Sequence, residues 1–378
     1  MKKKYIILSI IVLVLLITFV TSFNYFKTSN NYVEDSVNNQ TKIIKGISMN
    51  LEQTAGAGDY KTVTQSSWPT EGYKFNTELS RCENGSTLSW DDSKKAVVMN
   101  GNVSDKCYVY FDKVLTLANY VISQYTGIQG ENSLYYHDSN LANGVGDNSY
   151  RYAGASDSVN NYICLGSDAA TCPDDNLFRI IGVFGAQTKV IRAKSVGNKQ
   201  WHTSANNTWS SSSLNTYLNG EYLTSLGTLA EKIATTTWKV GGGSWANIGT
   251  SVPKTAYQYE VGSSASSTTY DAKIGLMYVS DYYYGASPSA WTLMGYNSDA
   301  MKDYRAATST NWLYLGSYEW TISRRSDDTN SAFCVNSTGY VFLYDVASIR
   351  GVRPSFNLLS STTYVSGSGS MSDPIIIE

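Results

Sequence analysis

The residues best suited to bind a polar ligand lie late in the chain, where Arg324, Arg325, Asp327 and Asp328 form the densest polar cluster. An arginine guanidinium presents a rigid fork of N–H donors that fits carboxylates and hydroxyls. The cluster therefore predicts a site for an anionic or sugar ligand. The same residues also suit a structural network of ion pairs, and the sequence leaves both interpretations open.

A further arginine, Arg353, precedes Pro354 in an otherwise apolar strand. A guanidinium that is buried in such a strand needs a carboxylate partner, because an unpaired buried charge is costly. Asp281 and Glu319 are the candidates for this partner. The structural interpretation predicts that replacing Arg353 by alanine destabilises the folded domain.

Aromatic residues form the second group of candidate contacts. The run from Tyr282 to Tyr284 cannot point all its rings to one side of a strand, so we expect at least one ring, with Tyr283 as the candidate, to be exposed in a loop. Exposed rings on loops suit contact with sugars or proteins. Trp291 and Trp312 are further candidates. The alternative is that the rings fold back onto the core, which we favour for the tryptophans.

The chain has five cysteines, and their positions favour two local disulfides. Cys82 and Cys107 flank a predicted hairpin, and Cys164 and Cys172 close a short loop. This assignment leaves Cys334 alone in a strand-like run, where it is expected to be a small buried apolar residue rather than a nucleophile.

No arrangement of residues predicts catalysis. Glycoside hydrolysis needs two acids at a set separation, which sequence spacing does not give. The only histidines, His137 and His202, have no partner at ligand spacing, and the chain contains neither C-x-x-C nor a Gly-x-Ser-x-Gly elbow. We therefore expect no catalytic residue, no metal and no cofactor.

The first residues predict export. Met1 is followed by three lysines, and residues 5–20 form an apolar run interrupted only by Ser9 and Thr18. Such a start stays in the cytoplasm while the rest of the chain crosses the membrane. The apolar run is short for a retained transmembrane helix over residues 1–26 and long for a cleaved signal peptide, so both alternatives remain open. In either case we expect residues after Thr21 to be extracellular.

The composition favours a neutral, hydroxyl-rich surface. Only 16% of the residues are charged, the net charge is −2, and the chain contains 30 tyrosines and 9 tryptophans. This balance offers no basic surface for nucleic acid. Tyrosine and tryptophan provide rigid contact area in sugar sites and paratopes, although tyrosine is also common in β-rich domains.

Short alternating runs and turn signals predict a small all-β module, then a helix, and then a larger mixed domain. The fold class that we predict is α+β, with an N-terminal transmembrane helix, the β-module and a mixed domain with long loops. The expected segments are a membrane anchor over residues 1–26, a stalk over 27–46, the β-module over 47–112, a linker helix and loop over 113–160, and the mixed domain over 161–378.

Several segments resemble an uncharacterised domain of exported proteins from Gram-positive gut bacteria, and the preceding β-module is similar to one that often accompanies it. The segments that carry the resemblance are residues 162–168, 176–184, 209–215, 273–282, 311–314, 319–324 and 352–358. The resemblance implies an exported protein but no settled activity.

Three of these features, the Trp209–Leu214 segment, the late tryptophan-containing strand and the Val352-Arg353-Pro354 run, also resemble the formylglycine-generating-enzyme type of C-type-lectin-like fold. This resemblance implies a C-type-lectin-like mixed domain. Enzymes of that superfamily use a cysteine pair in the late strand region, and here Cys334 stands alone, so oxidase chemistry is not expected.

Together these features predict a membrane-tethered cell-surface protein that binds a glycan or another surface protein without chemistry. The alternatives are an enzyme, either a degenerate formylglycine-generating type or a hydrolase, and a structural component of the cell surface. The expected partners are a glycan or surface protein and the membrane, reached through the N-terminal helix.

Overall fold

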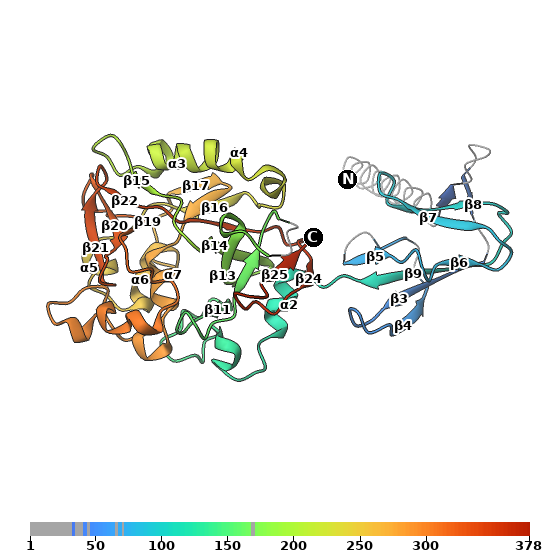
Figure 1. Ribbon diagram of the computed structural model, residues 1–378, viewed down its shortest axis with the longest axis horizontal. Helices are drawn as coiled ribbons and strands as arrows, with labels where there is room; N and C mark the ends of the chain where they lie inside the picture. Colours follow the sequence, from blue (N-terminus) through green and yellow to red (C-terminus); the bar gives the residue numbers. More distant parts are fainter. Residues whose placement is uncertain (1–31, 35–40, 44–45, 65–66, 70–71, 168–170) are drawn as a thin grey trace, which may run out of the picture. The chain divides into compact units, whose positions relative to one another are not determined.

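A computed structural model describes residues 32–34, 41–43, 46–64, 67–69, 72–167 and 171–378 (Figure 1). The chain divides into two compact units, Met1–Leu115 and Thr116–Glu378. Each unit is described by itself below.

The predicted fold class is wrong as stated and needs a correction. The fold is mixed α/β with more strand than helix. No helix in the described part of the chain has the length and apolar character to cross a membrane. Even the continuous helical stretch of α3, η4 and α4, from Ser213 to Ser225, is far shorter than the roughly 20 residues of a spanning helix. The anchor predicted over residues 1–26 lies outside the described residues, and the C-type-lectin-like assignment is not retained.

The N-terminal unit is built of strands. Two of them, β3 and β9, run parallel and side by side, and β4, β5 and β6 pair with them antiparallel. A separate antiparallel hairpin, β7–β8, turns at residues 92–95, where Lys95 has a positive φ of 48°. The strands are β1 (Tyr32–Glu34), β2 (Thr41–Ile43), β3 (Ile47–Glu52), β4 (Tyr60–Val63), β5 (Tyr73–Phe75), β6 (Arg81–Cys82), β7 (Thr87–Asp91), β8 (Ala96–Asn100) and β9 (Cys107–Lys113).

The core of this unit follows from the alternation of residues along β9. Val109 and Phe111 are buried, while Tyr108 and Tyr110, which alternate with them, are half-buried. Successive side chains of a strand point to opposite faces, so one face of β9 supplies the core. The Phe111 ring contacts the rings of Trp68, Phe75 and Trp90, with centroids 5.7–6.0 Å apart.

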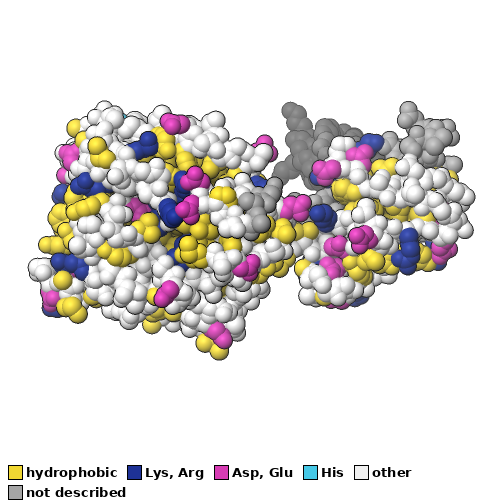
Figure 2. Space-filling model, in the orientation of Figure 1, with side chains coloured by type: hydrophobic (Ala, Val, Ile, Leu, Met, Phe, Trp, Pro, Cys, Tyr) yellow, Lys and Arg dark blue, Asp and Glu magenta, His cyan; other side chains and the backbone are white. Residues whose placement is uncertain are grey.

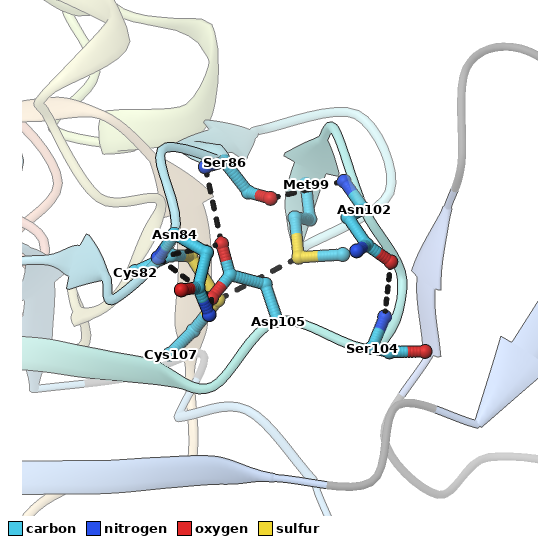
Figure 3. Close-up of a disulfide and its surroundings, with 8 residues drawn as sticks. All are labelled: Cys82, Asn84, Ser86, Met99, Asn102, Ser104, Asp105 and Cys107. Atoms are coloured by element: carbon cyan, nitrogen blue, oxygen red, sulfur yellow. Dashed lines mark hydrogen bonds between the residues drawn. A yellow bond between two sulfur atoms is a disulfide. The ribbon is translucent and has the colours of Figure 1, made fainter.

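A disulfide joins Cys82 of β6 to Cys107 of β9, with an S–S distance of 2.00 Å (Figure 3). The loop beside it is held by the buried Asp105, whose carboxylate accepts hydrogen bonds from the backbone N–H groups of Asn84 at 2.9 Å and Ser86 at 3.2 Å. The second disulfide, Cys164–Cys172 in the C-terminal unit, has an S–S distance of 2.02 Å. These are the two local pairs that the sequence predicted.

The C-terminal unit contains two main sheets. The larger follows the order β18-β23-β14-β13-β12-β25-β24, with β11 beside β13 and β10 beside β11, and the smaller follows β15-β22-β19-β20-β21. The strands are β10 (Leu134–Tyr136), β11 (Tyr150–Tyr152), β12 (Tyr162–Cys164), β13 (Leu177–Phe184), β14 (Gln187–Arg192), β15 (Asn198–Gln200), β16 (Thr236–Lys239), β17 (Thr269–Ala272), β18 (Ile274–Leu276), β19 (Glu319–Arg324), β20 (Ser331–Val335), β21 (Val341–Asp345), β22 (Ile349–Gly351), β23 (Pro354–Asn357), β24 (Tyr364–Ser366) and β25 (Ile375–Ile377).

Short helices connect these strands. Figure 1 shows α3 and α4 along one side of the unit, and α7 contacts β19 and β20. The α-helices are α2 (Leu117–Ser123), α3 (Ser213–Tyr217), α4 (Leu223–Ser225), α5 (Trp245–Ile248), α6 (Pro253–Glu260) and α7 (Val279–Tyr284). The tighter or wider helical turns are η1 (Glu131–Ser133), η2 (Asp174–Asn176), η3 (Trp209–Ser211), η4 (Leu218–Tyr222), η5 (Gly227–Glu231), η6 (Pro288–Ala290), η7 (Ala300–Lys302) and η8 (Tyr304–Thr310).

The surface of the described units agrees with the low charge of the composition. On the face drawn in Figure 2, neutral polar and hydrophobic side chains dominate, and charges of both signs are scattered among them. The large aromatic residues lie inside instead: Trp201, Trp209, Trp238 and Trp320 are each at most 1% exposed. Most of the tryptophans therefore belong to the core.

Candidate functional site

The predicted polar cluster forms the turn between β19 and β20 and is held together by its own contacts. The Arg325 guanidinium contacts Asp327 at 2.8 Å and Asp328 at 3.4 Å. Arg324 donates from Nε to the Gly241 carbonyl at 3.0 Å and from Nη1 to Asn207 Oδ1 at 3.1 Å. The side chains of Arg325, Asp327 and Asp328 are 25–48% exposed. The contacts fit a local structural network, and these four residues line none of the cavities described below.

Arg353 is buried against Glu319, one of its two predicted partners. Arg353 Nε lies 2.6 Å from Glu319 Oε1, and Nη2 donates to the Leu313 carbonyl at 2.7 Å. The two side chains are 0% and 4% exposed. This pair therefore holds the segment just before β23 to β19 inside the core and is closed to a ligand.

The expectation of an exposed ring among Tyr282, Tyr283 and Tyr284 is wrong, since all three are at most 1% exposed. The reason is that they lie on the short helix α7 rather than on a strand, and protein surrounds this helix on all sides. Trp291 and Trp312 are also buried at 1%. Each of these candidate rings donates to a backbone carbonyl, so it is a satisfied core residue.

Cys334 is the free cysteine among the described residues, and it is fully buried in β20. Burial raises the pKa of its thiol well above the ordinary value. Since the thiolate is the nucleophilic form, this position does not favour reactivity. The described residues also contain no group of three His, Cys, Asp or Glu side chains placed to hold a metal ion.

Sequence reasoning missed a cavity of about 230 Å³ in the C-terminal unit, called the central cavity below. One row of directly paired residues crosses four neighbouring strands of the large sheet beside it: Arg151 of β11, Gly182 of β13, Lys189 of β14 and Asn357 of β23. Directly opposed residues of antiparallel strands share a face, so three polar side chains converge on the cavity.

Gly182 makes this row possible. A Cβ atom at this position would lie 2.2 Å from the Tyr150 carbonyl oxygen, so only glycine lets β11 approach β13 here. The absent side chain also leaves space between Arg151 and Lys189. The opposite wall comes from β16, α6 and α7, which contribute Trp238 and Asp281 among others.

The carboxylate of Asp281 is fixed by the start of α7. It accepts a hydrogen bond from the Tyr278 backbone N–H at 2.8 Å, as the third residue of a helix does in a capping box. Behind it, the buried Glu260 accepts from the N–H groups of Val279 at 3.0 Å and Ser280 at 2.7 Å. Two carboxylates thus satisfy the first amides of α7, which favours negative charge at this end.

Ion pairs balance the charges at the cavity wall. Lys189 Nζ lies 2.5 Å from Asp281 Oδ2, and Arg151 lies 3.8 Å from Asp281 and 2.6 Å from Asp147. Lys189, Arg151 and Asp281 are each at most 5% exposed. Two buried cations therefore face two carboxylates, and Lys239, which is half-buried, adds a further cation to the lining.

Aromatic rings flank both buried cations. Lys189 Nζ lies 4.7 Å from the ring centre of Tyr278 and 5.4 Å from that of Trp238. The Arg151 guanidinium lies 4.6 Å from the ring centre of Phe184. Such contacts stabilise desolvated cations. All of these rings line the cavity, which is mostly apolar apart from its polar groups.

Two polar groups at the wall can still form hydrogen bonds with a ligand. Asn357 Oδ1 is a buried acceptor without a hydrogen-bond partner, while its amide nitrogen donates to Thr236. The Lys189 ammonium has three donors, and Asp281 is its one acceptor in the described part of the protein. A buried polar group without a partner is costly, so the cavity suits a ligand that supplies both a donor and an acceptor.

The pKa values of Asp147 and Lys189 reflect these ion pairs. Burial opposes the ionisation of Asp147, but the charge of Arg151 and hydrogen bonds from Ser149 outweigh it and lower the pKa of Asp147 from 3.8 to about 2. Burial also lowers the pKa of Lys189, while Asp281 opposes this shift. The buried charges of the wall therefore balance only while both pairs remain ionised, and the half-buried Lys239 adds one positive charge to them.

Replacing Asp147 by asparagine should lower the free energy of unfolding at neutral pH. It should also make this free energy depend less on pH in the acid range. The lowered pKa contributes about 2 kcal/mol above pH 4, and this is lost as pH falls from about 4 to about 2. Urea unfolding between pH 2 and pH 7 would measure the difference. Asp327→Asn is the control, because its carboxylate is exposed. Equal pH dependence of Asp147→Asn and the wild type would contradict the assignment.

Sequence signals for this cavity do exist. Lys189 lies between Thr188 and Val190 in an apolar strand, and Arg151 lies between two tyrosines. A charge within a buried strand needs a partner, as was argued for Arg353. The partner could not be found from sequence, because Asp281 lies 92 positions from Lys189.

The comparisons with known proteins give a family match for part of the chain. Residues 186–360 match a domain of unknown function, DUF6273. No curated protein and no solved structure matches the chain. Lys189, Trp238, Asp281 and Asn357 lie inside the matched segment, while Arg151 lies before it.

Proposed function

We propose that this protein works outside the cytoplasm as a non-catalytic binding protein, and that its central cavity holds a neutral sugar residue of a glycan. The observation that carries the proposal is the charge-balanced, aromatic-lined cavity with an unpaired acceptor at Asn357. Sugar sites combine apolar faces with a few fixed polar groups. A sugar hydroxyl can donate to Asn357 and accept from Lys189.

The balance of charges favours a neutral ligand. The two buried cations are paired with the two carboxylates, so a cationic ligand finds no free buried carboxylate, and an anionic ligand finds only the half-buried Lys239. The volume of about 230 Å³ lies below the roughly 300–1,000 Å³ of most ligand pockets. This size suits one sugar ring at the end of a glycan rather than a long polymer.

The proposed location rests on the two disulfides, because such bonds persist in oxidising compartments outside the cytoplasm. It also rests on the lysine-led apolar start of the sequence and on its resemblance to exported proteins of Gram-positive gut bacteria. An enzyme is less well supported, since the Cys334 thiol is buried and its pKa is raised.

A glycan array probed with the purified full-length chain tests the proposal. We expect binding to glycans that end in a neutral sugar. Asn357→Ala should weaken binding about threefold to tenfold, because one hydrogen bond is lost. Asp327→Asn, at a turn that does not line the cavity, should bind as the wild type does.

Thermal unfolding of Asn357→Ala provides the folding control. Weaker binding by a variant with a wild-type melting temperature would support the central cavity as the site. Binding to no glycan, or equal binding by Asn357→Ala and the wild type, would contradict the proposal.

A further inference from the structure

A second cavity, of about 420 Å³, lies in the C-terminal unit and is called the lateral cavity below. Phe178 and Leu229 form an apolar floor, while most of the exposed lining is polar. Its polar wall contains Arg192, at the end of β14, and Tyr222, at the end of η4. None of its lining residues lines the central cavity.

Two buried donors at this wall have no partner. The Tyr222 side chain belongs to a residue that is 6% exposed. Its hydroxyl proton has no acceptor, and the Arg192 guanidinium lies close enough to act on its oxygen. Arg192 Nε is also buried and unpaired, and the Arg192 side chain is 11% exposed. Burial raises the pKa of Tyr222 to about 12, so the hydroxyl keeps its proton at neutral pH. Two donors without an acceptor call for an oxygen atom from a ligand or from water.

Asp175 is the one acid among the described residues of the lining, and it leaves Arg192 available to a ligand. Asp175 contacts Arg192 Nη2, but its side chain is 90% exposed. An ion pair with so exposed a partner is weak, so a ligand carboxylate can compete with it. Asp175 belongs to η2, which follows shortly after the Cys164–Cys172 disulfide. The side-chain amide of Asn176, in the same turn, donates a hydrogen bond to the Leu165 carbonyl at 2.6 Å. The rim of the cavity is therefore held in place.

We propose that the lateral cavity is a second binding site, which takes a carboxylate-bearing ligand through Arg192 and Tyr222. Arginine binds a carboxylate through charge-assisted hydrogen bonds, and the tyrosine hydroxyl adds a neutral donor beside it. The apolar floor fits the carbon skeleton of the acid. The lateral cavity thus differs from the central cavity, where the buried charges are already balanced.

Calorimetric titration of the full-length chain with D-glucuronate tests this site, with D-glucuronamide as the neutral control. We expect glucuronate to bind and the amide to bind at least tenfold more weakly. A parallel titration with acetate separates an acidic sugar from a free small acid, because acetate lacks the sugar skeleton. Equal binding of glucuronate and glucuronamide would overturn the proposal.

Three variants sharpen the test. Tyr222→Phe keeps the ring and should weaken glucuronate binding about tenfold, and Arg192→Gln should abolish it. Asp175→Asn removes the competing carboxylate and should strengthen binding a few-fold. If water alone satisfies the two donors, glucuronate will not bind and none of the variants will show a change, which would overturn the proposal. Neutral-glycan binding should be unchanged in Tyr222→Phe, so failure here is distinguishable from failure of the central cavity.

Discussion

Asp281→Ala is expected to cause the largest loss of stability of any single substitution at the central cavity. The substitution leaves Lys189 without its carboxylate and removes one of the two that face Arg151, and both cations are at most 5% exposed. It also removes the acceptor of the Tyr278 N–H at the start of α7. Breaking a buried ion pair from one side costs about 3–5 kcal/mol.

Urea unfolding of the purified protein measures this loss. Asp327→Ala is the matched control, because it removes an exposed carboxylate that also pairs with an arginine, and it should cost less than about 1 kcal/mol. The double variant Lys189→Met with Asp281→Leu should recover part of the lost stability, since it leaves neither charge unpaired. A loss below about 1 kcal/mol in Asp281→Ala would contradict the structural role of this carboxylate.

Arg353→Ala is expected to cost about 3–5 kcal/mol as well, because it leaves Glu319 buried without its cation. Burial raises the pKa of Glu319, and Arg353 opposes this shift in the wild type. Without Arg353 the pKa of Glu319 should rise further. The destabilisation relative to the wild type should then shrink as pH falls toward the unfolded value of about 4.3, where protonation removes the buried charge.

Denaturant unfolding at pH 7 and at pH 5 would show both effects. Arg325→Ala removes a partly exposed arginine of comparable chemistry and should change stability by less than about 1 kcal/mol. If Arg353→Ala and Arg325→Ala unfold at the same denaturant concentration, the Arg353–Glu319 pair does not stabilise the core.

Local patterns predicted many strands of the fold. Alternating apolar residues and turn signals located β7, β8 and β9, and apolar runs around a glycine turn located β13 and β14. Each of these elements has a period or a turn that is local in sequence. The sequence from Leu226 to Ala234 also indicates a short helix, but the structure has only the helical turn η5 (Gly227–Glu231) there.

The segment around α7 could not be predicted in the same way. Lys273 to Val279 reads as one strand, but β18 ends at Leu276 and α7 begins at Val279. The helix forms because Asp281 and Glu260 satisfy its first amides, and Glu260 lies 19 positions earlier. The tertiary contact with Glu260 thus outweighs the local preference of this aromatic run for a strand.

The residues of the central cavity could not be predicted for a related reason. The sequence favours clusters such as Arg325 and Asp327 as candidate sites, because their members lie close together in the chain. The central cavity joins Arg151, Lys189 and Asp281 through strand register and a helix terminus instead. The row through Gly182 places Arg151 and Lys189 on the same face of the sheet, and ion pairs join both to Asp281.

The central claim, that the central cavity binds a neutral sugar, is tested most directly by calorimetric titration of the best-binding sugar from the array. The account predicts that Asn357→Ala binds more weakly than the wild type, that Asp327→Asn binds equally well, and that affinity is nearly the same at low and high salt, since a neutral ligand forms no ion pair. Undiminished binding by Asn357→Ala, or an affinity that falls steeply with salt, would contradict it.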